Sequence, residues 1–170
     1  MRLHSSRIPL IVKDVVQRLV EQELIEVLPD NVKEVELDVE SVLKEYLRAE
    51  RRLTEEAKDI AHNQGLGYSD HQKIKRRLAS RRGFGLYDDA VGYLSNQLIE
   101  TFLHTNHIEE IFAEDNELRA QIAPVLKRHM SNEDPLDEEV RKRIKNLKEG
   151  TQDWEIRYQQ ELERLKDLIG

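Results

Sequence analysis

The sequence predicts an all-α fold built from two tandem helical modules, each with a short amphipathic helix, a long helix and a short third helix. Apolar residues recur at helical spacing along most of the chain. Residues 83 positions apart match without a gap. No stretch is rich in Val or Thr with strict alternation, so we expect no sheet, with the apolar connector Leu24–Leu28 as a candidate for a short extended segment. We place repeat 1 at residues 1–83 and repeat 2 at residues 84–170, packed about a pseudo-two-fold axis.

The repeat is best supported by matches that lie outside the apolar stripes. Any two amphipathic helices can be slid until their apolar residues coincide, but this does not explain shared polar and glycine positions in a loop. Three such pairs follow the predicted long helix: Asn63 and Asn146, Gly67 and Gly150, Asp70 and Asp153. We therefore interpret the chain as a tandem duplication.

Each module opens with an amphipathic helix whose apolar residues follow i, i+3, i+4, i+7 spacing. In the first module these residues are Ile8, Ile11, Val12, Val15, Val16, Leu19 and Val20. Their counterparts are Val91, Leu94, Ser95, Leu98, Ile99, Phe102 and Leu103. A stripe this wide is typical of a helix face buried in a core.

A long second helix is predicted from the break at Pro29 to about Asn63. Its apolar residues, which include Val39 and Tyr46, follow alternating 4- and 3-residue steps, as in a coiled-coil seam. A helix of about 33 residues is about 50 Å long at 1.5 Å per residue, so it extends beyond a first helix of about 18 residues. Because an overhanging helix needs another partner, we predict that Val39 and Tyr46 belong to a partner-binding surface.

The third helix and the second long helix differ between the modules. A short third helix is predicted to end at about Arg82, before Gly83. In the second module, Pro124 and Pro135 fall where the long helix is expected. Proline in a helix interior removes a backbone hydrogen bond and clashes with the preceding turn. We therefore predict a kinked or divided helix in the second module.

Composition limits the classes of protein to which the chain can belong. Leu, Ile, Val and Phe make up about 29% of its residues, which is enough apolar surface to fold despite 36% charged residues. No apolar run approaches the roughly 18 residues of a membrane span, and no signal-peptide core follows the N-terminus. The lack of cysteine excludes disulfides and thiolate metal sites and suits a reducing cytoplasm. We expect a cytoplasmic protein without membrane contact.

The basic residues of the third helix are the first candidate site. Residues 71–82 carry six positive charges and no acid, so the rest of the chain has a net charge of −13. The six are Lys73, Lys75, Arg76, Arg77, Arg81 and Arg82. Such a cluster can bind nucleic-acid phosphates or another polyanion; alternatively it is a solvated face that pairs with the protein's own acidic helices. No aromatic residues are interleaved, which argues against stacking on single strands.

Two other groups have stronger structural explanations. A second basic stretch, Arg141–Lys148, lies at the C-terminal end of a helix, where cations favour the helix dipole. Trp154 and Tyr158 are one helical turn apart, and they either dock the last helix on the core or anchor a partner protein.

The sequence shows no convergent catalytic group. Glu100, His104 and His107 share a helical face, but no fourth metal ligand is evident, so we predict no metal site. The adjacent acids Glu55 and Glu56 point about 100° apart on a helix and do not converge. Neither a glycine-rich phosphate loop nor a nucleophile elbow is found. We expect no cofactor and no enzymatic activity.

The C-terminal segment from Glu149 to Tyr158, with Asp-Trp at its centre, resembles the end of a bacterial family catalogued as domain of unknown function number 507. The first three residues and the stretch from Leu47 to Ala57 are similar to its opening and middle. Short members look like one copy of the repeat, so the resemblance makes this chain a two-copy form. His71 stands where the second copy has Trp154. The resemblance implies an all-helical, cytoplasmic, bacterial protein, and it does not indicate an activity.

These observations favour a non-enzymatic protein–protein interaction or adaptor module that binds a partner protein or a second copy of itself. The alternative is a nucleic-acid- or ribosome-associated protein that uses the basic helix 73–82. An enzyme of unknown type is the third possibility.

Overall fold

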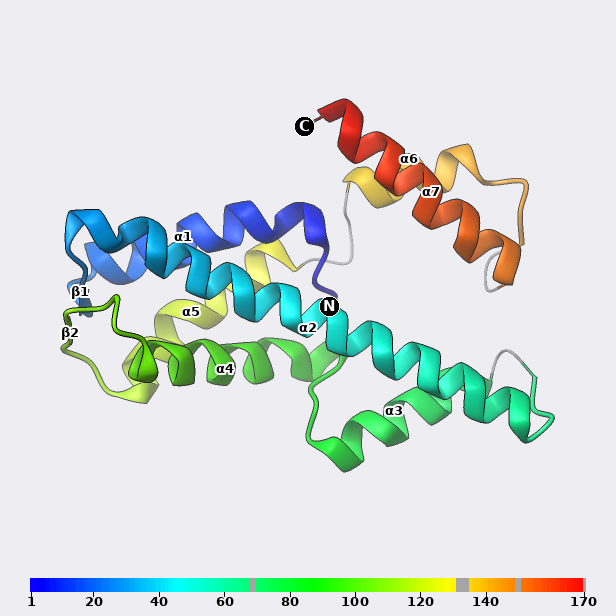
Figure 1. Cartoon of the computed structure of the whole chain (residues 1–170), viewed down its shortest axis with the longest axis horizontal. Coiled ribbons are helices and arrows are strands. Elements are labelled where there is room, and N and C mark those ends of the chain that lie inside the picture. The colour runs from blue at the N-terminus through cyan, green and yellow to red at the C-terminus, as the bar shows by residue number, and fades with distance from the viewer. Residues whose placement is uncertain (68–69, 131–134, 149–150, 170) are drawn as a thin grey trace. The chain divides into compact units, whose positions relative to one another are not determined.

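The computed structural model describes residues 1–67, 70–130, 135–148 and 151–169. Gly150, which the predicted repeat pairs with Gly67, lies outside these residues. Helices dominate the described part of the chain (Figure 1), which confirms the all-α prediction. The α-helices are α1 (Ile8–Glu21), α2 (Val32–Asn63), α3 (His71–Arg82), α4 (Ala90–His104), α5 (Asp115–His129), α6 (Pro135–Arg143) and α7 (Gln152–Ile169). Short 3-10 turns at Ser5–Arg7, Pro29–Asn31 and Tyr87–Asp89 precede α1, α2 and α4.

The expectation that the chain contains no sheet is wrong for four residues. Strand β1 (Ile25–Glu26) pairs antiparallel with β2 (Glu110–Ile111), and Ile25 lies opposite Ile111. The Phe112 N–H extends the pairing by donating to the Leu24 carbonyl at 2.9 Å. A two-residue strand is too short to show alternation in sequence, so this ribbon depends on the tertiary contact between its strands.

The helices occur in the order that the offset of 83 predicts. Shifted by 83, α1 becomes 91–104, where α4 lies, and α3 becomes 154–165, inside α7. Shifted in the same way, α2 becomes 115–146, the span occupied by α5 and α6. The predicted division of this long helix is confirmed, because α6 begins at Pro135 as a separate helix. Pro124 instead lies inside α5, where its exposed position lets water reach the unpaired carbonyl.

The chain forms two compact units whose boundaries differ from those of the predicted repeats. Unit 1 contains residues Met1–Arg52 and Ala79–Ser131, and unit 2 contains Leu53–Leu78 and Asn132–Gly170. Each unit therefore takes segments from both 1–83 and 84–170. The boundary at residue 83 describes a correspondence in sequence, whereas the compact units are discontinuous.

The main core lies in unit 1, where α1 and α4 pack against α5. Its largest fully buried side chains are Ile11, Leu19, Leu43, Leu94, Leu98, Phe102, Leu118, Ile122 and Leu126. The described residues of unit 2 include two smaller clusters: Ala57 and Ala61 of α2 with Ile74 of α3, and Val140 and Ile144 of α6 with Leu165 of α7.

The predicted exposed seam on the long helix is not available to a partner. Val39 is fully buried and Tyr46 is only 5% exposed, and both belong to the same cluster as Phe102 of α4 and Ile122 of α5. Beyond residue 53, α2 packs against α3. The overhang inferred from helix lengths is therefore covered by the chain's own later helices, and Val39 and Tyr46 are core residues.

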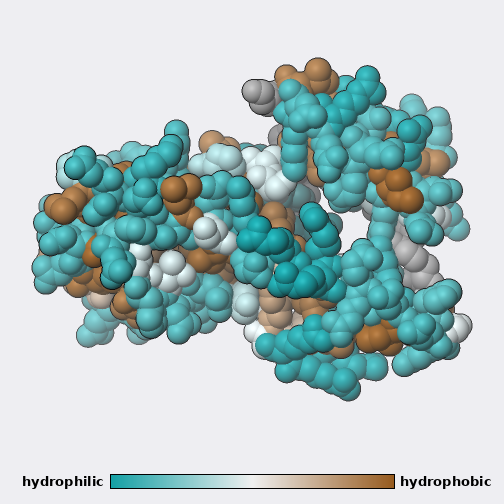
Figure 2. Space-filling model, viewed as in Figure 1, coloured by the Kyte–Doolittle hydropathy of each residue, from teal (hydrophilic) through white to brown (hydrophobic). Residues whose placement is uncertain are grey.

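Polar and charged residues cover most of the face seen in Figure 2, and apolar residues form small separate areas on it. Across the described residues, no helix has the length and apolar character needed to cross a membrane.

Candidate functional site

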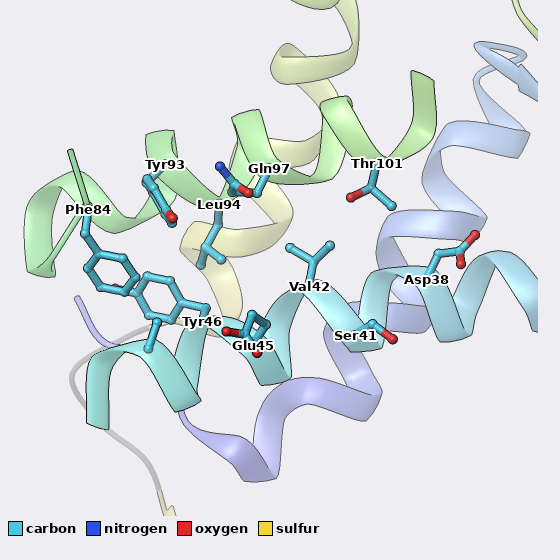
Figure 3. A pocket seen from close by; sticks show the side chains of 11 residues that line it. Asp38, Ser41, Val42, Glu45, Tyr46, Phe84, Tyr93, Leu94, Gln97 and Thr101 are labelled. Atoms are coloured by element: carbon cyan, nitrogen blue, oxygen red, sulfur yellow. The ribbon is translucent and has the colours of Figure 1, made fainter. Parts of the chain in front are cut away.

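A cavity of about 350 Å³ lies between α2 and α4 in unit 1 (Figure 3). We call it the α2–α4 groove. Its apolar lining consists of Val42, Tyr46, Ala49, Phe84, Tyr93 and Leu94, and its polar lining of Asp38, Ser41, Glu45, Gln97 and Thr101. Figure 3 shows the aromatic rings gathered at one end and Asp38 and Thr101 at the other. No lining residue carries a positive charge.

The aromatic end of the groove is a fixed wall. The Tyr46 ring stacks on Phe84 with centroids 4.8 Å apart, and Phe84 lies 4.9 Å from the tilted ring of Tyr93. The Tyr46 hydroxyl donates a 2.8 Å hydrogen bond to the Gly85 carbonyl. Burial raises the pKa of Tyr46, which keeps its hydroxyl protonated as a donor.

The acidic side of the groove consists of two carboxylates held by neighbouring donors. Glu45 accepts from Arg52 at 2.8 Å and from Arg48 at 3.0 Å, and these hydrogen bonds lower the pKa of Glu45. Asp38 accepts from the Thr105 hydroxyl at 2.7 Å and lies 2.9 Å from Nδ1 of His107, a contact that raises the pKa of His107.

A second candidate site is the exposed basic face of α3. The other face of this helix is buried through His71, Ile74, Lys75 and Ala79. We define the basic face as the exposed residues Lys73, Arg76, Arg77 and Arg81. Arg82 is also exposed, but it follows Lys75 by two helical turns and lies on the other side of the helix. Because these residues stand on one continuous helix, helix geometry alone sets their spacing.

The six predicted basic residues do not all share this face. Lys75 is only 4% exposed, because it falls on the stripe that α3 buries beside Ile74. Among the residues that the structure describes, none forms an ion pair with Lys73, Arg77 or Arg81. These three follow one another at intervals of four residues, so they form a line along the helix.

The second basic stretch has partners within its own unit. Arg141 pairs with Asp137 at 2.9 Å, and Arg143 lies 3.6 Å from both Glu139 and Glu161. These pairs support the structural interpretation of this stretch.

Trp154 and Tyr158 lie where α6 packs on α7. Their rings stack with centroids 5.1 Å apart, and the Arg141 guanidinium lies 5.2 Å from the Trp154 ring. The Tyr158 hydroxyl donates to Asp137, and both aromatic side chains border the cluster around Val140. These contacts favour docking of the last helix over the anchoring of a partner.

The histidines considered as metal ligands face different groups. His104 contacts the backbone carbonyl of Glu100 at 2.8 Å, whereas His107 contacts Asp38 on α2. Within the described ranges, no three His, Asp or Glu side chains are grouped so that they could hold a metal ion.

Sequence reasoning did not find the α2–α4 groove. Its lining comes from residues 38–49 and 84–101, which lie in different predicted repeats. The one available signal is that Phe84 and Tyr93 lie close together in a chain with few aromatic residues. Their convergence on Tyr46 depends on how α4 packs against α2.

Comparison with known proteins gives one informative result. No curated protein matches the chain. The family model described as "Protein of unknown function (DUF507)" matches residues 1–167. This match is continuous through both predicted repeats and covers nearly the whole chain. The chain therefore belongs to the DUF507 family.

Proposed function

We propose that this protein is a non-enzymatic nucleic-acid-binding protein that contacts the phosphate backbone through the basic face of α3. The observation that supports it is the line formed by Lys73, Arg77 and Arg81. These side chains are exposed and have no ion-pair partner among the described residues. This distinguishes them from the arginines of α2 and α6, several of which pair with acids of their own unit.

The geometry favours contacts to a double-stranded backbone. Successive members of the line are about 6 Å apart along the helix axis, so the three span about 12 Å. Phosphate contacts of this kind are electrostatic and independent of base sequence. The basic face has no aromatic side chain on which bases could stack, which argues against single strands. The residues outside 71–82 have a net charge of −13. They repel a polyanion and so restrict its contact to α3.

The test is salt-dependent binding of a fluorescent RNA or DNA duplex, measured by anisotropy. For duplex DNA, three neutralised phosphates give a slope of about −2.7 in log K against log salt, or about a 40-fold loss between roughly 50 and 200 mM salt. The variant Lys73→Gln/Arg77→Gln/Arg81→Gln is expected to lose this part of the slope.

The matched control removes three charges from the second basic stretch, as Lys142→Gln/Lys145→Gln/Lys148→Gln. These lysines are also exposed, and the control keeps the same net charge as the α3 variant. It is expected to retain the wild-type slope. Equal slopes for the two variants, or no salt-sensitive binding at low ionic strength, would contradict the proposal.

An adaptor role through self-association is the second candidate. The supporting observation is that Leu103 and Phe112 are 55% and 56% exposed, so burial of these two apolar side chains against a second copy would be favourable. Val20, which corresponds to Leu103 in the repeat, is 40% exposed. Light scattering on the wild type and on Leu103→Ser/Phe112→Ser tests this role. A dimer that the double variant disrupts would support it, and a monomeric wild type would exclude it.

We also propose that the chain arose by tandem duplication and acts in the bacterial cytoplasm. The order of helices at the offset of 83 supports the duplication. The antiparallel pairing of β1 with β2 also supports it, because two-fold-related copies meet in this orientation. The lack of cysteine is in keeping with the cytoplasm.

A further inference from the structure

We propose that the α2–α4 groove binds a small organic cation, in which an ammonium or guanidinium group is carried on an apolar stem. The inference concerns unit 1 and uses no residue of α3, so it does not depend on nucleic-acid binding. It follows from comparing the groove with the interface between α1 and α5, which corresponds to it in the repeat.

The α1–α5 interface is closed by cations of the chain itself. The Asp14 carboxylate of α1 accepts from Arg128 at 3.0 Å and contacts Nε2 of His129 at 2.6 Å, both on α5. One turn further along α1, Arg18 donates to the Gln121 side chain at 2.8 Å. These polar contacts join the two helices beside the apolar core.

At the corresponding positions, the α2–α4 groove has none of these cations, and Glu45 stands where Arg128 stands. Arg128 and His129 correspond to Glu45 and Tyr46, Asp14 to Gln97, Arg18 to Thr101, and Gln121 to Asp38. All five counterparts line the groove. The described part of the structure contains no hydrogen bond from Gln97 to Glu45 or from Thr101 to Asp38. Among these described residues, the groove thus has no cation that joins its two helices as Arg128 joins α5 to α1. Glu45 pairs instead with Arg48 and Arg52 of its own helix, and Asp38 with His107 beyond the end of α4.

The lining suits a cation with an apolar stem. A positive group near Glu45 or Asp38 is attracted by the carboxylates, and the π-faces of Tyr46, Phe84 and Tyr93 favour a cation or an apolar stem beside them (Figure 3). An anion is repelled by the same carboxylates, and a neutral apolar molecule gains nothing from them. Arg48 and Arg52 already contact Glu45, but these exposed pairs are weak competitors for a partly enclosed ligand.

The size of the groove limits the ligand. A volume of about 350 Å³ lies at the lower end of the range for ligand cavities, roughly 300–1,000 Å³. This accommodates one small molecule or one long basic side chain, and not a folded element of a partner. The cation is therefore either a free amine or guanidine, or a Lys or Arg side chain.

NMR titration of the methyl groups of Val42 and Leu94 tests the inference. The probes are 2-phenylethylammonium and agmatine as free cations, acetyl-arginine methylamide as a partner side chain, and 2-phenylethanol as the neutral isostere. We expect a cation to give saturable shifts with a Kd on the order of 1 mM, and the alcohol to bind about tenfold more weakly. Binding of the free cations identifies a metabolite source, and binding of the arginine amide alone identifies a protein source.

Two variants locate the site. Glu45→Gln is expected to weaken cation binding about three- to fivefold, whereas Glu40→Gln, which removes an acid of α2 outside the groove, leaves it unchanged. Gln97→Arg places a guanidinium of the chain itself at the groove and is expected to prevent binding of added cations. The absence of saturable shifts, or equal affinity for the cation and the alcohol, would overturn the inference.

Discussion

Replacing Tyr46 by Phe tests whether this residue belongs to a partner-binding seam or to the core. Sequence periodicity places Tyr46 on a partner-binding seam, whereas the structure buries it and directs its hydroxyl to the Gly85 carbonyl at 2.8 Å. Phe keeps the ring stacked on Phe84 and removes only the hydrogen bond. The Gly85 carbonyl then loses this buried donor.

The expected loss in the free energy of unfolding is about 1–2 kcal/mol, because an unsatisfied buried polar group costs roughly 1–3 kcal/mol. For a chain of this size, 1 kcal/mol shifts Tm by about 2–4 °C, so the variant is expected to melt about 2–8 °C lower. Far-ultraviolet circular dichroism follows the helices through urea or thermal unfolding. Trp154 fluorescence reports separately on unit 2.

Tyr93→Phe is the matched control in the same aromatic cluster. Tyr93 is half-buried, and its hydroxyl makes no hydrogen bond to the described residues, so its removal is expected to cost less than about 0.5 kcal/mol. If Tyr46→Phe and Tyr93→Phe unfold at the same midpoint as the wild type, Tyr46 is not fixed in the core as the structure shows, and the seam interpretation regains its basis.

Three further changes test the packing and the electrostatics of unit 1. Gly85→Ala is expected to cost about 1–3 kcal/mol in thermal unfolding, because the new Cβ would lie 2.5 Å from the Asp89 carbonyl oxygen. Phe102→Ala, at a side chain 1% exposed, is expected to cost about 3–5 kcal/mol in urea unfolding. Asp38 raises the pKa of His107 above 6.5, so their contact stabilises fully below about pH 6.5 and is lost as the pH rises through the folded-state pKa. Asp38→Asn is therefore expected to abolish this decline in urea midpoints between about pH 6 and pH 9.

The sequence predicts the helices well because their signals are local. The span of α2, the end of α3 before Gly83 and the helix start at Pro135 all depend on periodicity or on residues that start and stop helices. Gly83 has a φ of +65°, a conformation that glycine adopts without the cost of a Cβ, so this end of α3 is fixed by one residue.

The sequence-based predictions that are wrong concern which helix packs against which face of its neighbours. A seam containing Val39 and Tyr46 has the same sequence whether it faces a partner or the helices that follow it, and here α4 and α5 bury both residues. The run of basic residues in the sequence predicts that Lys75 shares the exposed face of its neighbours, yet Lys75 lies on the stripe with Ile74 and Ala79 that α3 buries. The sequence does not predict the α2–α4 groove either, because its two sides come from distant segments that meet only through tertiary packing.

The discontinuity of the compact units has a consequence for how such a chain could arise. Residues 1–83 contain Ile11 and Leu43 but not Leu98, Phe102 or Leu126, so neither repeat holds a complete core. If the chain arose by the proposed duplication, a single copy would need a second copy to complete this core. Fusion would then replace a bimolecular assembly by an intramolecular one at an effective concentration on the order of millimolar. Joined copies would no longer need to be self-complementary, which would allow one interface to have the bridging Arg128 and the other to have Glu45 at the same position.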